Sequence, residues 1–407
     1  MASNNEAKKR QLVGKVAAAA KRKIGGKAGA TAERFTQQFL ANVPPDDLLG
    51  ESEGDLLGWI LSMWDFAQQR DTSKPKLRLY NPTKTEHGWA SGHSLLEIIN
   101  DDMPFLVDSV TAELNRLGAE VHLVIHPVLD IERTARGKFK ALGAPDEHHG
   151  DGHGESCMQL QISEQPKSSH KEIVSQLQAV LADVRAAVED WLPMRQRCRD
   201  VMKELQVHPP KLPRDEVTEC LSFLEWLDDD HFTYLGYREY SFTGKGEKTV
   251  AKIDAKSGLG ILRDTKVSIF DGLRSLGHLP ADVQDFVRRP ELLRVTKANR
   301  RATVHRSVHL DTVAVKTIDS RGRVTGEQLF VGLFTSVAYS RSPREIPLLR
   351  HKVDAVMARA GFMPGSHDGK ALMHILETYP RDELFEVPES ELHDIAMGVL
   401  HLQERQR

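Results

Sequence analysis

Residues 93–126, HSLLEIINDDMPFLVDSVTAELNRLGAEVHLVIH, decide the fold class. Side chains alternate at the start of this stretch, so that Leu95, Glu97 and Ile99 share one face of a predicted strand. A predicted helix follows, with Pro104 in its first turn and Gly118 after its last. The apolar side chains of this helix are Leu106, Val107, Val110, Leu114 and Leu117. Residues 121–126 alternate again, which predicts a second strand.

The next 65 or so residues complete a recognisable plan. Residues 158–162 alternate between apolar and Gln side chains, which predicts a further half-buried strand. A long apolar stripe from Ile173 to Trp191 predicts a helix that ends before Pro193. The order strand, helix, two or more strands, helix is the split βαβ plan of a ferredoxin-like α+β domain with an antiparallel sheet.

A second unit begins after the stiff connector Pro209–Pro213. Residues 217–227 predict a helix and the aromatic residues 232–240 a strand. Residues 311–318 and 328–334 predict the two arms of a hairpin around the turn residues 319–322. Pro347 is expected to open a helix that runs to Gly361, and residues 366–407 have a helical pattern.

A chain of 407 residues is too long for one hydrophobic core, and its 40% hydrophobic and 28% charged residues suit a soluble globular protein. We expect a disordered basic arm at residues 1–30, because its lysines and arginines stand among Ala and Gly with little to bury. A helical segment should follow at 31–92. Two ferredoxin-like domains are predicted at 93–208 and 214–345, and a helical linker at 346–407.

Composition and charge exclude several classes of function. A net charge of −3 gives no field that would recruit nucleic acid or an anionic membrane. The arm could still act as a tail for an anionic partner, but it has no aromatic residue before Phe35 to stack on a base. No apolar run reaches the roughly 20 residues of a membrane-spanning helix. The three cysteines lie far apart, which favours a reducing cytoplasm, although a mitochondrial-type presequence is also compatible with the N-terminal composition.

Nucleotide and nucleophile motifs are missing from the sequence. Gly258-Leu-Gly260 lacks the third glycine of a dinucleotide fingerprint. The stretch 365–370, GSHDGK, is one residue too short for a phosphate-binding loop, so we interpret it as a helix start capped by Ser366 or Asp368. Neither GxSxG nor HExxH occurs. We therefore predict no catalytic residue and no cofactor-binding residue in this chain.

A metal site is a separate hypothesis. Donors cluster in one loop, but its glycines favour a flexible, solvated segment over converging ligands. The donors are Glu147, His148, His149, Asp151, His153 and Cys157. A metal-dependent hydrolase that uses His148, His149 and His153 is the least favoured function, and we predict no metal.

Two groups of residues could bind a small regulatory ligand. The first group lies around the strand-to-helix loop of the first domain, where helix N–H groups could take a carboxylate and acidic side chains an amino group. It consists of Asn100, Asp101, Asp102 and Asp108. The second group is Ser340, Arg341 and Arg344, before a helix start, where guanidinium groups suit a carboxylate or phosphate. Helix capping and a salt bridge to another domain are the respective alternatives.

Several long strings resemble the N-terminal region of the large bacterial NAD-specific glutamate dehydrogenases. They are NDDMPFLVDS (100–109), HFTYLGYREY (231–240), GLFTS (332–336), YSRSPREIPLL (339–349), GSHDGKAL (365–372) and ILETYPRDELF (375–385). These strings stand in the order of the family. The resemblance covers most of the chain from about Phe35 onward.

The resemblance implies that the two ferredoxin-like domains are ACT-like, and that 346–407 leads towards a third, missing one. It implies a parent enzyme that oxidises L-glutamate with NAD and water to 2-oxoglutarate, ammonium and NADH as a homo-oligomer. This chain would be a non-catalytic regulatory and oligomerisation segment that contacts the rest of its polypeptide and other subunits. The alternative is an ACT-type sensor of an amino-acid effector. Met103-Pro104 stands where ligand-binding ACT domains place glycine, which departs from that pattern.

Overall fold

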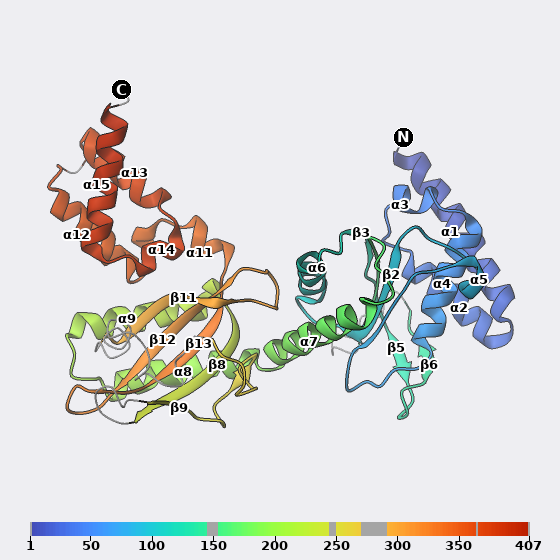
Figure 1. Ribbon diagram of the computed structural model, residues 1–407, viewed down its shortest axis with the longest axis horizontal. Helices are drawn as coiled ribbons and strands as arrows, with labels where there is room; N and C mark the ends of the chain where they lie inside the picture. The colour runs from blue at the N-terminus through green and yellow to red at the C-terminus, as the bar shows by residue number, and fades with distance from the viewer. Residues whose placement is uncertain (1, 145–153, 244–249, 270–290, 364, 406–407) are drawn as a thin grey trace. The chain divides into compact units, whose positions relative to one another are not determined.

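The computed structural model describes residues 2–144, 154–243, 250–269, 291–363 and 365–405. The chain divides into two compact units, residues 1–184 with 303–307 and residues 185–302 with 308–407. Every strand pairing within the described ranges is antiparallel. The predicted α+β class with antiparallel sheets is confirmed (Figure 1).

The sheet of the first unit has the strand order β1-β2-β7-β3. Its strands are β1 (Lys76–Tyr80), β2 (Ser94–Asp101), β3 (Val121–Ile125) and β7 (Glu155–Ile162), and the short β4 (Val128–Leu129) also pairs with β7. The predicted strands at 93–100, 121–126 and 158–162 are confirmed. A small hairpin, β5 (Ile131–Arg133) with β6 (Phe139–Leu142), projects from the same unit.

Strand β1 fills an edge position that the ferredoxin-like plan gives to a strand after the second helix. It precedes β2 in the sequence and pairs with it, Arg78 opposite Glu97. The predicted helical segment 31–92 therefore also contains a strand. Sequence reasoning missed β1 because it has only five residues and its face towards α4 carries the cations Lys76 and Arg78, which donate to the carbonyl oxygens of Phe66 and Ser62, in place of apolar side chains.

Helices cover both faces of this sheet (Figure 1). Helices α6 (Leu106–Arg116) and α7 (His170–Glu189) lie on one side. On the other side lie α1 (Ala2–Ile24), α2 (Gly26–Phe39) and α4 (Glu53–Ala67), with the short α3 (Pro45–Leu49) and α5 (Lys84–His87) nearby in sequence. The core on this side joins Phe35 and Trp64 to Ile99 of β2, so the two strand faces are buried against different helices.

The predicted mobile arm at residues 1–30 is wrong. Helix α1 occupies residues 2–24 of this segment and α2 begins at Gly26, and α1 buries Val16, Ala17 and Ala20 completely. Lys9 is also buried, and its Nζ donates a hydrogen bond to the Ala41 carbonyl oxygen at 2.7 Å. The alanine run is a strong helix former, and small side chains suffice to pack closely against α2 and α4.

The sheet of the second unit has the order β10-β8-β13-β12-β11, and β9 also pairs with β8. Its strands are β8 (Phe232–Thr243), β9 (Val250–Ile253), β10 (Leu259–Gly260), β11 (Leu293–Arg301), β12 (His309–Ile318) and β13 (Val324–Phe334). The predicted hairpin is confirmed: the Asp319 carboxylate accepts the N–H groups of Arg321 and Arg323 at 2.9 Å, and Gly322 takes φ 77°.

Helices precede and follow these strands. Helices α8 (Trp191–Val207) and α9 (Arg214–Trp226) come before β8. After β13 come α11 (Ser336–Ser340), α12 (Leu349–Ala360), α13 (His367–Thr378), α14 (Arg381–Glu386) and α15 (Glu389–Arg405). One apolar core joins α8, α9, the sheet and the C-terminal helices. That this unit is a second ACT-like domain stays a prediction.

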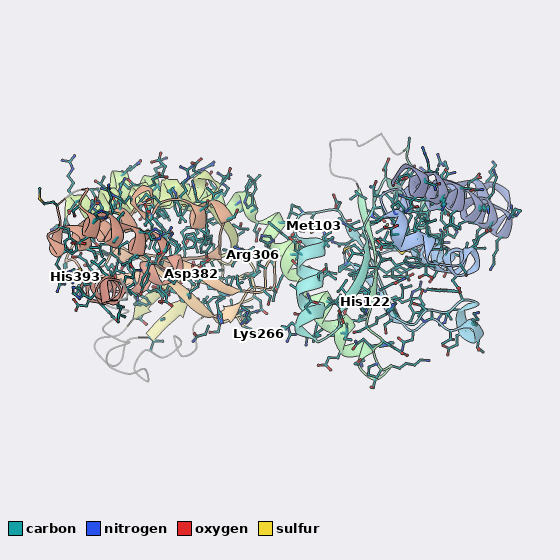
Figure 2. The ribbon with its side chains drawn as sticks, turned by 90° about the horizontal axis from the view of Figure 1, so that it is seen from above. Met103, His122, Lys266, Arg306, Asp382 and His393 are labelled. Atoms are coloured by element: carbon teal, nitrogen blue, oxygen red, sulfur yellow. The ribbon has the colours of Figure 1, made fainter. Side chains whose placement is uncertain are left out.

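An ion-pair triad holds α14 to the edge of the second sheet. Lys297 Nζ on β11 lies 2.5 Å from Asp311 Oδ1 on β12 and 3.1 Å from Asp382 Oδ2 on α14. Figure 2 labels Asp382.

No helix within the described ranges has the length and apolar composition needed to cross a membrane.

Candidate functional site

The seven predicted ligand residues divide between the two units. Asn100, Asp101, Asp102 and Asp108 belong to the first unit, and the segment 340–344 to the second. The structure places each of them, and for most it shows a partner within the chain. Whether any of them binds a ligand stays a prediction.

Asp101 is engaged in a buried network rather than free for a ligand. Arg70, whose side chain is fully buried, donates to Asp101 at 2.8 Å and to Glu155 at 2.9 Å. Arg133 adds two hydrogen bonds to Glu155, both of 2.6 Å. Arg133 also donates to the Ala67 carbonyl oxygen at 3.0 Å. Two guanidinium groups and two carboxylates thus tie the β5–β6 hairpin, the end of α4 and the start of β7 together.

The neighbours of Asp101 differ in exposure. Asn100 is buried and stands opposite Ser156 in the β2–β7 register. Asp102 is exposed, and its backbone N–H donates to the Gly154 carbonyl oxygen at 2.8 Å. Nearby, burial lowers the pKa of His126, against the opposite effect of the Asp102 carboxylate. His126 is therefore neutral at pH 7 and lies 2.7 Å from the Ser156 hydroxyl.

The loop between β2 and α6 departs from the glycine-bearing pattern. Figure 2 labels Met103, which with Pro104 leads into α6. Phe105 takes φ 71°, a left-handed conformation that glycine would adopt without steric cost. Asp108 is exposed, and its Oδ2 lies 3.0 Å from Nδ1 of His305, a residue that is grouped with the first unit. Asp101 and Asp108 thus have different partners within the chain, Arg70 for the first and His305 for the second.

A second buried network was missed by sequence reasoning. Glu97 is fully buried on the face of β2 that packs on α4. Arg78 Nε donates to it at 2.8 Å and Gln159 Nε2 at 2.8 Å. Burial raises the pKa of Glu97, and the Arg78 guanidinium partly offsets this. The sequence does carry a signal that Glu97 needs a partner. Glu97 lies between Leu95 and Ile99 on one strand face, and a carboxylate buried there requires a cationic or amide partner.

The second group of predicted residues is exposed and paired locally. Ser340 donates to the Val337 carbonyl oxygen at 3.1 Å. Arg341 lies 3.4 Å from Glu345, and Arg344 lies 3.1 Å from Asp354. Arg341 and Arg344 therefore do not form a joint guanidinium clamp. The start of α13 behaves as predicted, because Ser366 Oγ accepts the N–H of Gly369 at 3.1 Å as an N-cap.

A groove of about 800 Å³ runs along α8 and α9. Asp228 on its wall is held by Arg195 Nε at 2.7 Å and Arg199 Nε at 2.8 Å. Lys203 adds a positive charge to the wall and Glu225 a negative one. The groove thus presents both signs of charge and does not select an anion or a cation.

The remaining chemical candidates are the predicted metal loop and the cysteine thiols. The predicted metal loop with His148, His149 and His153 lies outside the described residues. Elsewhere in the described chain, no group of three or more His, Cys, Asp and Glu side chains could hold a metal ion. Burial raises the pKa of the thiols of Cys198 to about 11 and Cys220 to about 12, so neither is a thiolate at neutral pH.

Strands β2, β3 and β7 with helices α6 and α7 define the first unit as a ferredoxin-like α+β domain. Residues 35–177 match the family described as glutamate dehydrogenase, ACT1 domain. Residues 346–405, which span α12 to α15, match glutamate dehydrogenase, helical motif 1. The predicted ACT-like character of the first unit is confirmed.

Proteins that are similar over most of this chain have names that agree with these two family matches. The NAD-specific glutamate dehydrogenase of Halomonas elongata is 38% identical over 381 residues, which are 93% of this chain and 23% of that protein. The enzyme of the same name from Pseudomonas aeruginosa is 36% identical over 386 residues, 94% of this chain and 24% of that protein. That from Mycobacterium tuberculosis is 26% identical over 311 residues, 75% and 18% of the respective chains.

The chain belongs to the NAD-specific glutamate dehydrogenase family and corresponds to its N-terminal, ACT-domain region. It spans about a quarter of the length of the curated relatives from Halomonas and Pseudomonas.

Proposed function

We propose that this chain is a non-catalytic regulatory and assembly segment of an NAD-dependent glutamate dehydrogenase. The parent reaction converts L-glutamate, NAD and water to 2-oxoglutarate, ammonium and NADH. The observation that carries the proposal is the sheet topology. Dinucleotides bind at the carboxyl ends of parallel strands, beside a helix N-terminus, whereas every pairing within the described ranges is antiparallel.

Sequence features support the same proposal. The GxGxxG fingerprint is missing from the sequence, and the carboxylates of Glu97, Asp190 and Glu219 are engaged in ion pairs that tie elements together. Ion pairs between helices and strands hold these elements in fixed positions, which suits a domain that supports assembly or transmits a conformational change. We further propose that the segment acts in the cytoplasm, within a homo-oligomer, and contacts other subunits.

The test is to incubate the purified chain with NAD and glutamate and to record NADH absorbance. A full-length family enzyme serves as the positive control. We expect no NADH above the enzyme-free blank, and sustained turnover would contradict the proposal. Light scattering of the same sample tests the proposed role in assembly. We expect a mass above the 45.6 kDa of one chain, and a monomer at every concentration would contradict that role.

An amino-acid effector is the alternative ligand hypothesis. Asp102 and Asp108 favour it, because both carboxylates stay exposed beside the start of α6. Calorimetric titration with aspartate, glutamate and arginine tests it, and Asp102→Asn should weaken any binding at this loop. Binding that Asp102→Asn leaves unchanged would place the effector elsewhere.

A further inference from the structure

A cavity of about 380 Å³ lies between α12 and the start of α13 in the second unit. Its apolar lining includes Met357 from α12, Phe362 from the connecting turn and Met373 from α13. The turn between the helices uses Gly361 at φ 68° and Gly365 at φ 83°, which lets the chain reverse within a few residues. The volume falls in the range of small-molecule sites, about 300–1,000 Å³.

The rim of this cavity carries one unbalanced positive charge. Arg344 and Asp354 both line it and form an ion pair at 3.1 Å, so their charges offset each other. Lys370 also lines it, and among the described residues its Nζ has no ion-pair or hydrogen-bond partner. The Ser366 cap fixes the first turn of α13: the Lys370 backbone N–H donates to the Ser366 carbonyl oxygen at 3.0 Å.

The lining selects among ligand types. Thioether and phenyl side chains adapt to apolar groups of varied shape. A second charge on the ligand would have to lie against Met357, Phe362 and Met373 without a partner, which is costly. A single carboxylate could instead meet Lys370 at the rim while an apolar tail fills the floor.

We propose that this cavity binds a small monocarboxylate with an apolar tail. Lys370 pairs with the carboxylate, and Met357, Phe362 and Met373 enclose the tail. Dicarboxylates, among them glutamate and 2-oxoglutarate, are excluded by their second charge. Binding at this cavity can be measured on the chain alone. Only the further step, that the bound monocarboxylate is a regulatory effector, rests on the proposed function.

The test is calorimetric titration of the whole chain with octanoate. We expect saturable binding with a dissociation constant of about 1 mM or tighter, as an apolar carboxylate of this size permits. Lys370→Met should weaken binding about tenfold, the value of one charge-assisted contact. Met373→Glu should abolish it. Lys203→Met, an equivalent change at an exposed lysine of α8, should leave it unchanged.

Several results would overturn the inference. They are the absence of octanoate binding in the millimolar range, equal effects of Lys370→Met and Lys203→Met, or equally strong binding of octan-1-ol or of glutarate. Circular dichroism of each variant shows whether it is folded, and Lys370→Met, an exposed substitution, keeps the test valid if Met373→Glu does not fold. Failure here leaves the turnover test untouched, and turnover of glutamate would leave the binding result standing.

Discussion

Replacing Glu155 with Gln is the sharpest perturbation of the first unit. The Glu155 carboxylate accepts one hydrogen bond from Arg70 at 2.9 Å and two from Arg133 at 2.6 Å. A neutral amide keeps one acceptor oxygen and turns an N–H₂ group towards the two guanidinium groups. Arg133, with a side chain only 5% exposed, then remains a buried cation without a carboxylate.

The magnitude follows from this geometry. Removing one member of a buried ion pair costs about 3–5 kcal/mol of unfolding free energy. Arg70 retains Asp101, and Arg133 retains the carbonyl oxygens of Ala67 and Gly137, so we expect the lower end, about 3 kcal/mol. In a unit of this size, 1 kcal/mol shifts the melting temperature by about 2–4 °C, which predicts a loss of roughly 6–12 °C.

The assay is thermal unfolding followed by circular dichroism and tryptophan emission. Trp64 reports on the same region, because its ring lies 5.2 Å from that of Phe139 in the β5–β6 hairpin. Glu132→Gln is the matched control. Its partner is Lys140, the two side chains are 56% and 58% exposed, and it should cost less than about 0.5 kcal/mol. Equal melting temperatures for the two variants would refute the assignment of a stabilising buried network.

Three further substitutions test other parts of the fold. Glu219→Gln removes the carboxylate that holds Arg350 at 2.7 Å, and urea denaturation at pH 7 should show a loss of about 1–2 kcal/mol. Burial raises the pKa of this carboxyl, but Arg350 and a backbone N–H outweigh that and hold the pKa below 4.5. Its contribution is therefore complete above pH 4.5 and should vanish as the pH falls through the folded-state value; a pH-independent difference would contradict this. Gly260→Ala puts a Cβ 2.1 Å from a backbone carbonyl oxygen at φ 58° and should cost more than about 3 kcal/mol, against about 1–2 kcal/mol for Gly322→Ala, where φ is 77° and the space is open; similar melting temperatures would count against this packing. Val16→Asp places a carboxylate at a fully buried position of α1 and should cost about 3 kcal/mol or more and make α1 sensitive to trypsin, whereas a mobile arm would be cut equally fast in both forms.

Periodicity predicted the elements whose faces are sharply divided. Strand β7 alternates Met158, Leu160 and Ile162 with two Gln side chains, α6 has a continuous apolar stripe, and the Asp319 turn has the residue types that its backbone needs. These features are local, so the sequence carries them directly. Strand β1 has five residues with cations on one face, and α1 has an alanine-rich buried face, so neither gave a clear local signal.

The partners in the buried ion-pair networks near the candidate site could not be predicted from periodicity, for a different reason. Arg70 meets Glu155 across 85 positions of sequence, and Arg78 meets Glu97 only because β1 pairs with β2. A pattern shows which face a side chain occupies but not which distant residue faces it. The prediction of a ligand group at Asp101 overlooked Arg70 for this reason, and Arg344 was correctly placed near a helix start while its partner Asp354 was missed.

Titration of the purified chain with NAD, followed by calorimetry, tests the central claim most directly, since it needs no turnover. The antiparallel sheets predict no saturable heat up to millimolar NAD, while a full-length family enzyme binds under the same conditions. Stoichiometric binding of NAD to this chain would mean that it contains a dinucleotide site and would contradict the account.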